Sequence, residues 1–283
     1  MAELIYETDM YQGSLLGVKA HPRMSSEDLT LRKVLYKIRA VAANRILGTI
    51  THVSTHDSVA ALTFDDGPNP EYTPRLLDIL DKYQARATFF MVGEVAQRHR
   101  WLVKRVSQAG HAIGNHSWDH ASFPLLTGRD RRAQIRACHK AIAPYGQRIF
   151  RPPYGDQTVG SYLDALWMGH KVVTWNVVAE DWLDHDSDWI ADNLASRVRP
   201  GSVILFHDAL YDTIEERYTD RQPMFQAVKM LLERLSDRFR FVTIPELFRH
   251  GRPQRIYWYK KSEPDWLNKL TKREGEARQY SGI

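Results

Sequence analysis

The sequence predicts an α/β fold in which short strands and longer helices alternate along the chain and close into a barrel. Two observations carry this prediction. From residue 59 onward, short apolar runs alternate with stretches of helical apolar spacing, and seven such runs occur. Repeated βα units build a parallel sheet with its helices outside. Seven strands at this spacing favour a barrel over an open sheet.

The expected elements follow one another in a regular order. Strands are expected over residues 59–64, 87–91, 111–114, 149–151, 171–177, 203–206 and 241–244. Helices are expected between them, over residues 74–83, 94–109, 130–143, 160–168, 188–198 and 225–236. In barrels of this kind the active site forms at the C-terminal ends of the strands. Functional side chains should therefore follow strands.

The chain divides into three expected parts. Residues 58–250 form the main domain and carry 24 basic and 24 acidic residues. Residues 1–57 form an N-terminal extension with an amphipathic basic helix. We favour packing of this helix on the main domain, and peripheral contact of residues 29–47 with an anionic membrane is the alternative. Residues 251–283 form a basic, aromatic C-terminal tail.

Composition excludes several classes of protein. The only cysteine, Cys138, excludes an intramolecular disulfide and a cysteine-rich zinc site. No apolar run approaches the roughly 20 residues that span a bilayer. The first residues lack a secretory signal pattern, so a cytoplasmic location is expected. The neutral main domain lacks the basic stripe of a nucleic-acid binder, and no nucleic-acid partner is expected.

Two adjacent carboxylates, Asp65 and Asp66, follow the first strand of the main domain. Successive side chains of extended backbone point in opposite directions, so the two are expected to do different work. After the strand at 111–114 come His116 and His120, and two imidazoles four residues apart suit one metal ion. With Asp66 they make three protein ligands, which leaves a position open for water as in catalytic zinc sites.

Three further polar clusters also follow strands. Arg151 and Tyr154 lie in the sequence Arg-Pro-Pro-Tyr-Gly, where the planar guanidinium fork of the arginine suits a carboxylate. Asp181 and Trp182 form an Asp-Trp pair. His207 ends an apolar strand and is well placed for acid chemistry.

These five clusters together resemble a known family. Thr63-Phe64-Asp65-Asp66-Gly67-Pro68 matches in full the first motif of the polysaccharide deacetylases of carbohydrate esterase family four, the NodB-homology domain. The other clusters, including Leu205-Phe206-His207, match the remaining motifs in order over residues 57–248. Family members often carry an aspartate where this chain has Val178. The resemblance implies a distorted (β/α)7 barrel that holds one divalent metal ion, usually zinc, with cobalt, nickel, manganese or iron as alternatives.

The resemblance also implies roles for the metal ligands and the base. It implies that Asp66, His116 and His120 bind the metal ion. It implies that Asp65 is the general base and that Arg151 orients it.

For the remaining residues the resemblance implies contacts with the reacting amide. The backbone N–H of Tyr154 would stabilise the oxyanion, and His207 would be the general acid. Asp181 would support that histidine, and Trp182, with Tyr154, would contact the substrate.

The expected function is a metal-dependent hydrolase that removes acetyl groups, most directly the N-acetyl groups of N-acetylglucosamine units, from a polysaccharide or oligosaccharide. Two alternatives stay open: an inactive carbohydrate-binding homologue, and an iron oxygenase that uses the two histidines and the carboxylate. The expected partner is an acetylated glycan. Aromatic candidates to line its groove are Trp118, Phe123, Tyr154, Trp182 and Tyr211, and packing in the core is an equal alternative for each.

Overall fold

The computed structural model describes residues 48–263, 265, 269, 271 and 272. The helix expected within residues 29–47 lies outside the described residues. None of the helices in the described part of the chain is long and apolar enough to cross a membrane.

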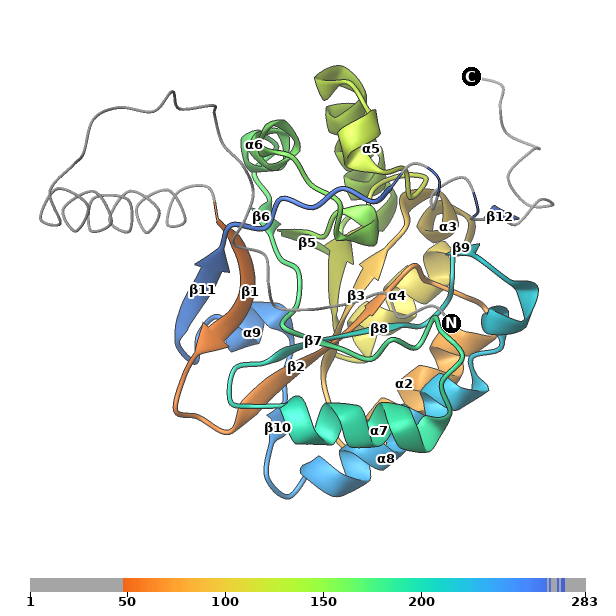
Figure 1. Ribbon diagram of the computed structural model, residues 1–283, viewed down its shortest axis with the longest axis vertical. Coiled ribbons are helices and arrows are strands. Elements are labelled where there is room, and N and C mark those ends of the chain that lie inside the picture. The colour runs from red at the N-terminus through yellow and green to blue at the C-terminus, as the bar shows by residue number, and fades with distance from the viewer. Residues whose placement is uncertain (1–47, 264, 266–268, 270, 273–283) are drawn as a thin grey trace, which may run out of the picture. The chain divides into compact units, whose positions relative to one another are not determined.

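A curled parallel sheet forms the centre of the main domain (Figure 1). Its hydrogen-bonded order is β6 (Lys171–Val172), β5 (Gly146–Phe150), β4 (Ala112–Asn115), β3 (Ala87–Met91), β2 (Val59–Asp65), β8 (Val203–His207) and β7 (Val177–Val178). A further short strand, β10 (Arg240–Phe241), pairs with the beginning of β2. Every residue of β2 is buried, as expected for a central strand covered on both faces. The α/β class and the distorted barrel of seven strands are confirmed.

The distortion lies at the two edges of the curled sheet, which forms a half-barrel. The sequence predicts one strand over residues 171–177, and this prediction is wrong, since the segment forms two strands of two residues each. β6 pairs with β5 and β7 pairs with β8, at opposite ends of the hydrogen-bonded order. Between them, the Thr174 N–H donates to the Ile50 carbonyl at 2.9 Å. One chain segment therefore supplies both edge strands of the curled sheet, and β1 contacts this segment between them.

Helices cover the outside of the sheet (Figure 1). They are α2 (Tyr72–Lys82), α3 (Gly93–Arg98), α4 (Arg100–Gln108), α5 (Gly128–Ile142), α6 (Val159–Trp167), α7 (Ser187–Arg197), α8 (Gln222–Leu235) and α9 (Ile244–Leu247), with 3-10 turns η1 (Phe123–Leu125), η2 (Pro153–Gly155) and η3 (Glu216–Thr219). The single helix expected over residues 94–109 is broken at His99, whose φ of −118° and ψ of 47° are not helical. The strand expected over residues 241–244 is limited to β10, because α9 begins at Ile244.

Local sequence explains where several helices begin. The Thr127 side chain accepts a hydrogen bond from the Asp130 N–H and caps α5. Thr158 and Ser161 cap each other reciprocally at the start of α6. In α8 the buried residues recur at helical spacing, so one face packs on the core while the other is solvated.

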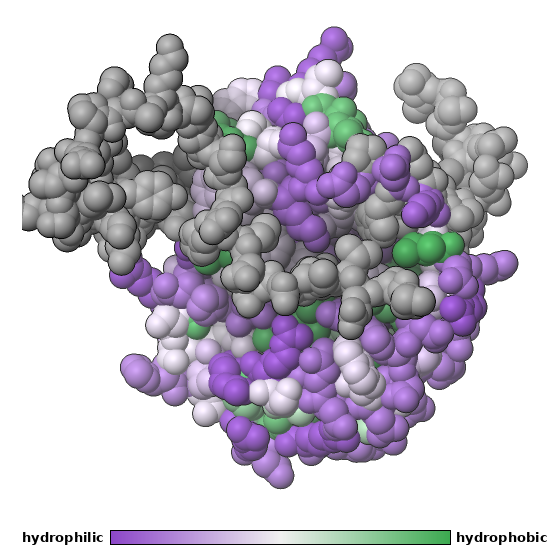
Figure 2. All heavy atoms as spheres, in the orientation of Figure 1, coloured by the Kyte–Doolittle hydropathy of each residue, from purple (hydrophilic) through white to green (hydrophobic). Residues whose placement is uncertain are grey.

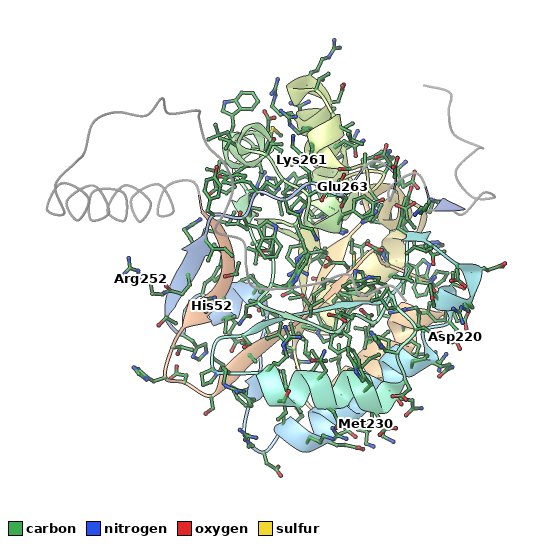
Figure 3. The ribbon with its side chains drawn as sticks, viewed as in Figure 1. His52, Asp220, Met230, Arg252, Lys261 and Glu263 are labelled. Atoms are coloured by element: carbon green, nitrogen blue, oxygen red, sulfur yellow. The ribbon has the colours of Figure 1, made fainter. Side chains whose placement is uncertain are left out.

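Strands outside the barrel tie the ends of the described chain to it. β1 (Thr49–Ser54) pairs antiparallel with β11 (Arg252–Ile256), and Figure 3 shows His52 and Arg252 on these two strands. β1 begins before residue 58 and buries Ile50 in the core. β12 (Thr271–Lys272) pairs with β9 (Asp212–Thr213). The division of the chain at residues 57 and 250 stays a prediction.

Candidate metal centre

The carboxylates of Asp65 and Asp66 diverge at the C-terminal end of β2. Asp65 is the last residue of the strand, and Asp66 has a φ of 76° in the left-handed region. Gly67 follows in close contact with a buried carboxylate, since a Cβ at this position would lie 2.3 Å from Asp208 Oδ1. The turn therefore needs glycine and points the two aspartates at different neighbours.

Asp66 lies between two imidazoles. Its Oδ1 is 3.4 Å from His116 Nε2 and 3.2 Å from His120 Nε2, and all three residues are buried. The three ligand atoms lie within 4.8 Å of one another, and no other such group occurs among the described residues. Asp66 Oδ1 is itself buried without a hydrogen-bond partner in the described chain. A buried carboxylate oxygen facing two imidazole nitrogens fits a divalent cation.

The second nitrogen of each histidine is held by an acceptor. His116 Nδ1 donates to the Arg151 carbonyl at 2.8 Å, and His120 Nδ1 donates to Asp212 Oδ2 at 2.9 Å. Because a carbonyl or carboxylate oxygen only accepts, both Nδ1 atoms carry the proton and both Nε2 atoms can present a lone pair. This is the tautomer that a metal ligand requires.

Negative charge is concentrated around these imidazoles. Burial lowers the pKa of His120, but Asp66 and Asp212 outweigh it and raise this pKa to about 10. Burial likewise acts to raise the pKa of Asp66, but His120 and His116 hold it well below its ordinary value. A divalent cation at this point would neutralise the same excess of negative charge.

The Arg151 side chain binds and orients Asp65. Its side chain is fully buried, and its Nη1 donates to Asp65 Oδ1 at 2.7 Å and to Thr63 Oγ1 at 2.8 Å. Its remaining nitrogens donate to the carbonyls of Val173 and Thr174 in the closing segment of the barrel. One oxygen of Asp65 is thus fixed, while Oδ2 lies 3.7 Å from His116 Nε2 on the metal side.

His207 is held by Asp181 on the other side of the site. His207 Nδ1 donates to Asp181 Oδ1 at 3.0 Å, and the His207 N–H donates to Asp181 Oδ2 at 2.9 Å. Burial lowers the pKa of His207, but the Asp181 charge outweighs it and the net shift is upward. The Trp182 ring packs edge-on against the imidazole at 5.1 Å between centroids. Nε2 of His207 is left as the atom for proton transfer.

Tyr154 lies in η2 with a φ of 58°, and its ring packs against His120 at 4.5 Å between centroids. Its hydroxyl donates to Asp212. Asp66, Ser117 and His120 also have positive φ. Such strained backbone in non-glycine residues gathers at functional sites. The structure therefore brings all nine residues singled out from the sequence to the C-terminal ends of the strands.

Comparison with known proteins agrees with this geometry. The family described as polysaccharide deacetylase matches residues 52–173. A peptidoglycan-N-acetylglucosamine deacetylase of Bacillus cereus is 33% identical over 199 residues, which are 69% of this chain and 70% of that protein. The chain belongs to the polysaccharide deacetylase family. A chitooligosaccharide deacetylase of Sinorhizobium fredii is 36% identical over 57% of this chain and 77% of its own.

Solved structures of similar fold also include deacetylases. The crystal structure of a peptidoglycan N-acetylglucosamine deacetylase in complex with 4-naphthalen-1-yl-N-oxidanyl-benzamide is 32% identical, with a TM-score of 0.65 over 72% of this chain and 94% of that chain. The expected metal-dependent deacetylase function agrees with these relatives, and they do not favour the oxygenase or the inactive homologue.

Two positioning residues of the deacetylase, Asp212 and Arg221, were not predicted from the sequence, and Tyr211 was predicted only as an aromatic candidate for the groove. Asp212 receives hydrogen bonds from His120 and Tyr154, and the Tyr211 N–H donates to Asp66 Oδ2 at 3.0 Å. Arg221, also buried, donates to Asp181 and to the His207 carbonyl. All three lie between β8 and α8, where the apolar residues show no helical or strand spacing that would predict the path of the chain. In the sequence, these positioning residues are indicated only by the large number of charged residues that follow His207.

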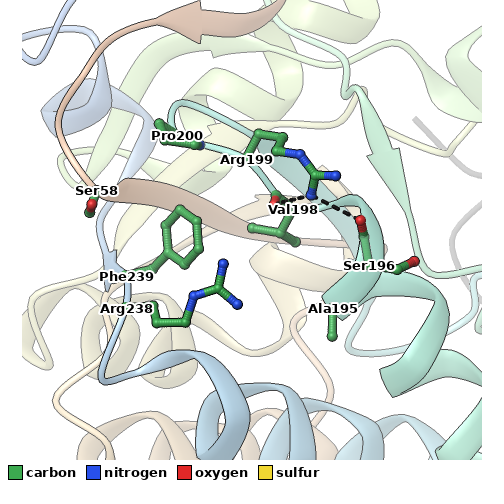
Figure 4. A pocket seen from close by; sticks show the side chains of 8 residues that line it. All are labelled: Ser58, Ala195, Ser196, Val198, Arg199, Pro200, Arg238 and Phe239. Atoms are coloured by element: carbon green, nitrogen blue, oxygen red, sulfur yellow. Dashed lines mark hydrogen bonds between the residues drawn. The ribbon is translucent and has the colours of Figure 1, made fainter.

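Two other observations show which parts of the molecule do not belong to the metal centre. Phe123 is fully buried in a core cluster, so of its two interpretations, groove or packing, the structure supports packing. A separate pocket is lined by Ser58 and by residues around Arg199 and Phe239 (Figure 4). Ser58 precedes β2, so this pocket lies at the amino ends of the strands, opposite the metal centre. There the Arg199 side chain donates to the backbone carbonyls of Ser196 and Val198, at 2.9 and 2.8 Å.

Proposed function

We propose that this deacetylase holds one zinc ion with Asp66, His116 and His120 and removes N-acetyl groups from N-acetylglucosamine units of a glycan. The observation that carries the proposal is the buried, unpartnered Oδ1 of Asp66 facing two imidazole nitrogens, with a fixed carboxylate on one side and a fixed imidazole on the other. A bound divalent ion supplies acidity to water and polarises a carbonyl.

Asp65 is the proton acceptor in this proposal. Because Arg151 occupies Oδ1, Oδ2 is the oxygen available to take a proton from attacking water. The buried ion pair with Arg151 fixes the orientation of this carboxylate. As the carbonyl oxygen of the acetyl group becomes negative, the Tyr154 N–H would donate a hydrogen bond to it, and a bound ion held by Asp66, His116 and His120 would add positive charge nearby.

His207 is the proton donor. Burial lowers its pKa, but the Asp181 charge outweighs burial and shifts the pKa upward, which favours the protonated imidazole, and Nε2 is the atom that can give a proton to the departing amine. An amine leaves poorly unless it is protonated. Arg221 in turn fixes Asp181, so the acid is oriented by two buried groups behind it.

The remaining parts of the proposal concern the contacts with the glycan and the location of the protein. Trp182 and Tyr154 flank the metal centre and are proposed to contact the sugar ring. The acetylated glycan is the proposed partner. Contact of residues 29–47 with a membrane and a cytoplasmic location stay predictions.

The test is release of acetate from oligomers of N-acetylglucosamine, with and without a chelator. We expect Asp65→Asn and His207→Ala each to reduce kcat by about 10²–10⁴ while metal stays bound. Asp66→Ala is expected to lose the metal as well. Asp78→Asn is the matched control, since Asp78 is an exposed carboxylate on α2. Near-full activity of both Asp65→Asn and His207→Ala with metal bound would show that the proposed roles are wrong.

A further inference from the structure

The outward face of α6 is apolar. Val159, Leu163, Leu166 and Trp167 are exposed by 39%, 47%, 37% and 73% of their surfaces. They are spaced i, i+4, i+7 and i+8, so they form one ridge along the helix. The opposite face already packs on the core through Tyr162 and its neighbours. Within residues 48–263 no other element covers this contiguous apolar ridge, and such a ridge marks an interaction site.

A row of cations runs beside this ridge on α5. Arg129, Arg132, Arg136 and Lys140 are spaced by three or four residues and share one side of the helix. The row meets the ridge where the Arg132 guanidinium lies 5.4 Å from the centre of the Trp167 ring. Arg132 is paired with Asp164. In the described part of the chain the other three cations of the row make no ion pair.

The charge of the domain is polarised toward this side. Residues 95–179, which include α4, α5 and α6, carry twelve Lys and Arg but four Asp and Glu. Residues 180–250 carry nine basic and fourteen acidic residues. The neutral sum over the main domain therefore conceals a strongly basic half. In Figure 2 hydrophobic and hydrophilic residues lie side by side over α5 and α6, at the top of the view.

We propose that the α5–α6 surface, made of the apolar ridge and the cationic row, docks on a membrane that contains anionic lipid. Apolar side chains beside cations match the boundary between acyl chains and anionic headgroups. A soluble polyanion would use the cations alone and leave the ridge in water. A second copy of this chain would meet like charge along the row. The membrane is therefore the partner that uses both features.

The test is sedimentation of the full chain with vesicles of phosphatidylcholine alone or mixed with phosphatidylglycerol. We expect binding only to the mixed vesicles, with weakening as salt is raised. Each cation near such a surface contributes about fivefold to affinity, so Arg136→Gln with Lys140→Gln should weaken binding about 25-fold. Trp167→Ala should weaken it about tenfold or more through the lost apolar contact.

Matched variants make the result specific. Trp101→Ala removes a 53% exposed tryptophan of α4 outside the ridge, and Lys229→Gln removes a cation of α8; both should bind like the unaltered chain. All variants should release acetate from a soluble oligomer at the normal rate, which verifies folding. Absence of vesicle binding would overturn the proposal, as would binding that Trp167→Ala leaves unchanged. Vesicle-free dimerisation lost in Trp167→Ala would assign the ridge to a second copy instead.

Discussion

Asp212 should set the metal affinity of this deacetylase without being a ligand. Its side chain is 1% exposed, and its Oδ2 accepts both the His120 Nδ1–H and the Tyr154 hydroxyl. In Asp212→Asn the charge is lost, and the amide nitrogen can take the place of the accepting oxygen. His120 is then free to move its proton to Nε2, the atom that faces Asp66.

The expected magnitude follows from the bond that is lost. A hydrogen bond to a charged group contributes about 1.5–3 kcal/mol. Since about 1.4 kcal/mol corresponds to a tenfold change in an equilibrium constant, Asp212→Asn should weaken metal binding about 10- to 100-fold. Loss of Tyr154 alone should matter less, because Tyr154→Phe leaves the contact between His120 and Asp212 in place.

Competition with a chromogenic chelator measures this affinity directly for zinc or cobalt. Asp164→Asn is the matched control, because Asp164 is a partly buried carboxylate that pairs with two arginines of α5 away from the metal centre. The spectrum of bound cobalt would also report a change of ligand geometry. If Asp212→Asn bound metal within twofold of the unaltered protein, the reasoning about the histidine tautomer would be refuted.

Three further outcomes are expected. Arg151→Met leaves the Asp65 carboxylate buried without its cation, so the free energy of unfolding in urea should fall by about 3–5 kcal/mol; a smaller loss than 1 kcal/mol would contradict this. Asp181→Asn removes the charge that raises the pKa of His207, so the alkaline limb of the kcat/KM profile should move to lower pH, and an unmoved limb would exclude His207 as the acid. Burial, followed by Arg86, lowers the pKa of His111 to about 4, so the folded state is disfavoured as pH falls below about 6.5. This residue should cost about 3 kcal/mol of stability between pH 6.5 and 4, and His111→Asn, which keeps an acceptor for the N–H of β3, should remove that pH dependence.

The sequence predicted much of the barrel because its elements are locally specified. Strand β3 has the expected bounds, and the polar clusters follow strands, so parallel pairing brings their side chains to one end. The division of residues 171–178 was missed because Val172, Val173 and Val177 read as one apolar run. The break between β6 and β7 depends on their pairing with β5 and β8, and no local sequence pattern predicts it.

The supporting groups behind the site were missed for a similar reason. Arg221 and Asp212 lie in an irregular stretch, where charged residues are ordinarily solvated. Only their burial against Asp181 and His120 distinguishes them from neighbours such as Glu216, which stays at the surface. Side-chain types and spacing predicted the groups that act on substrate. The groups that hold them depend on the path of a loop.

The closing segment between β6 and β7 also bears on how copies of this protein behave in a crowded solution. A parallel sheet normally ends in two strands with unpaired backbone N–H and C=O groups, onto which another chain can add a strand. Here β6 and β7, the two edge strands, belong to one continuous stretch of eight residues, Lys171 to Val178. Beside β6, the parallel bridge between Val173 and Ile50, with the Thr174 N–H donating to the Ile50 carbonyl, places β1 where an added strand would pair. Addition of a foreign strand at this edge would first require β1 to leave, so β1 protects this edge of the sheet against aggregation.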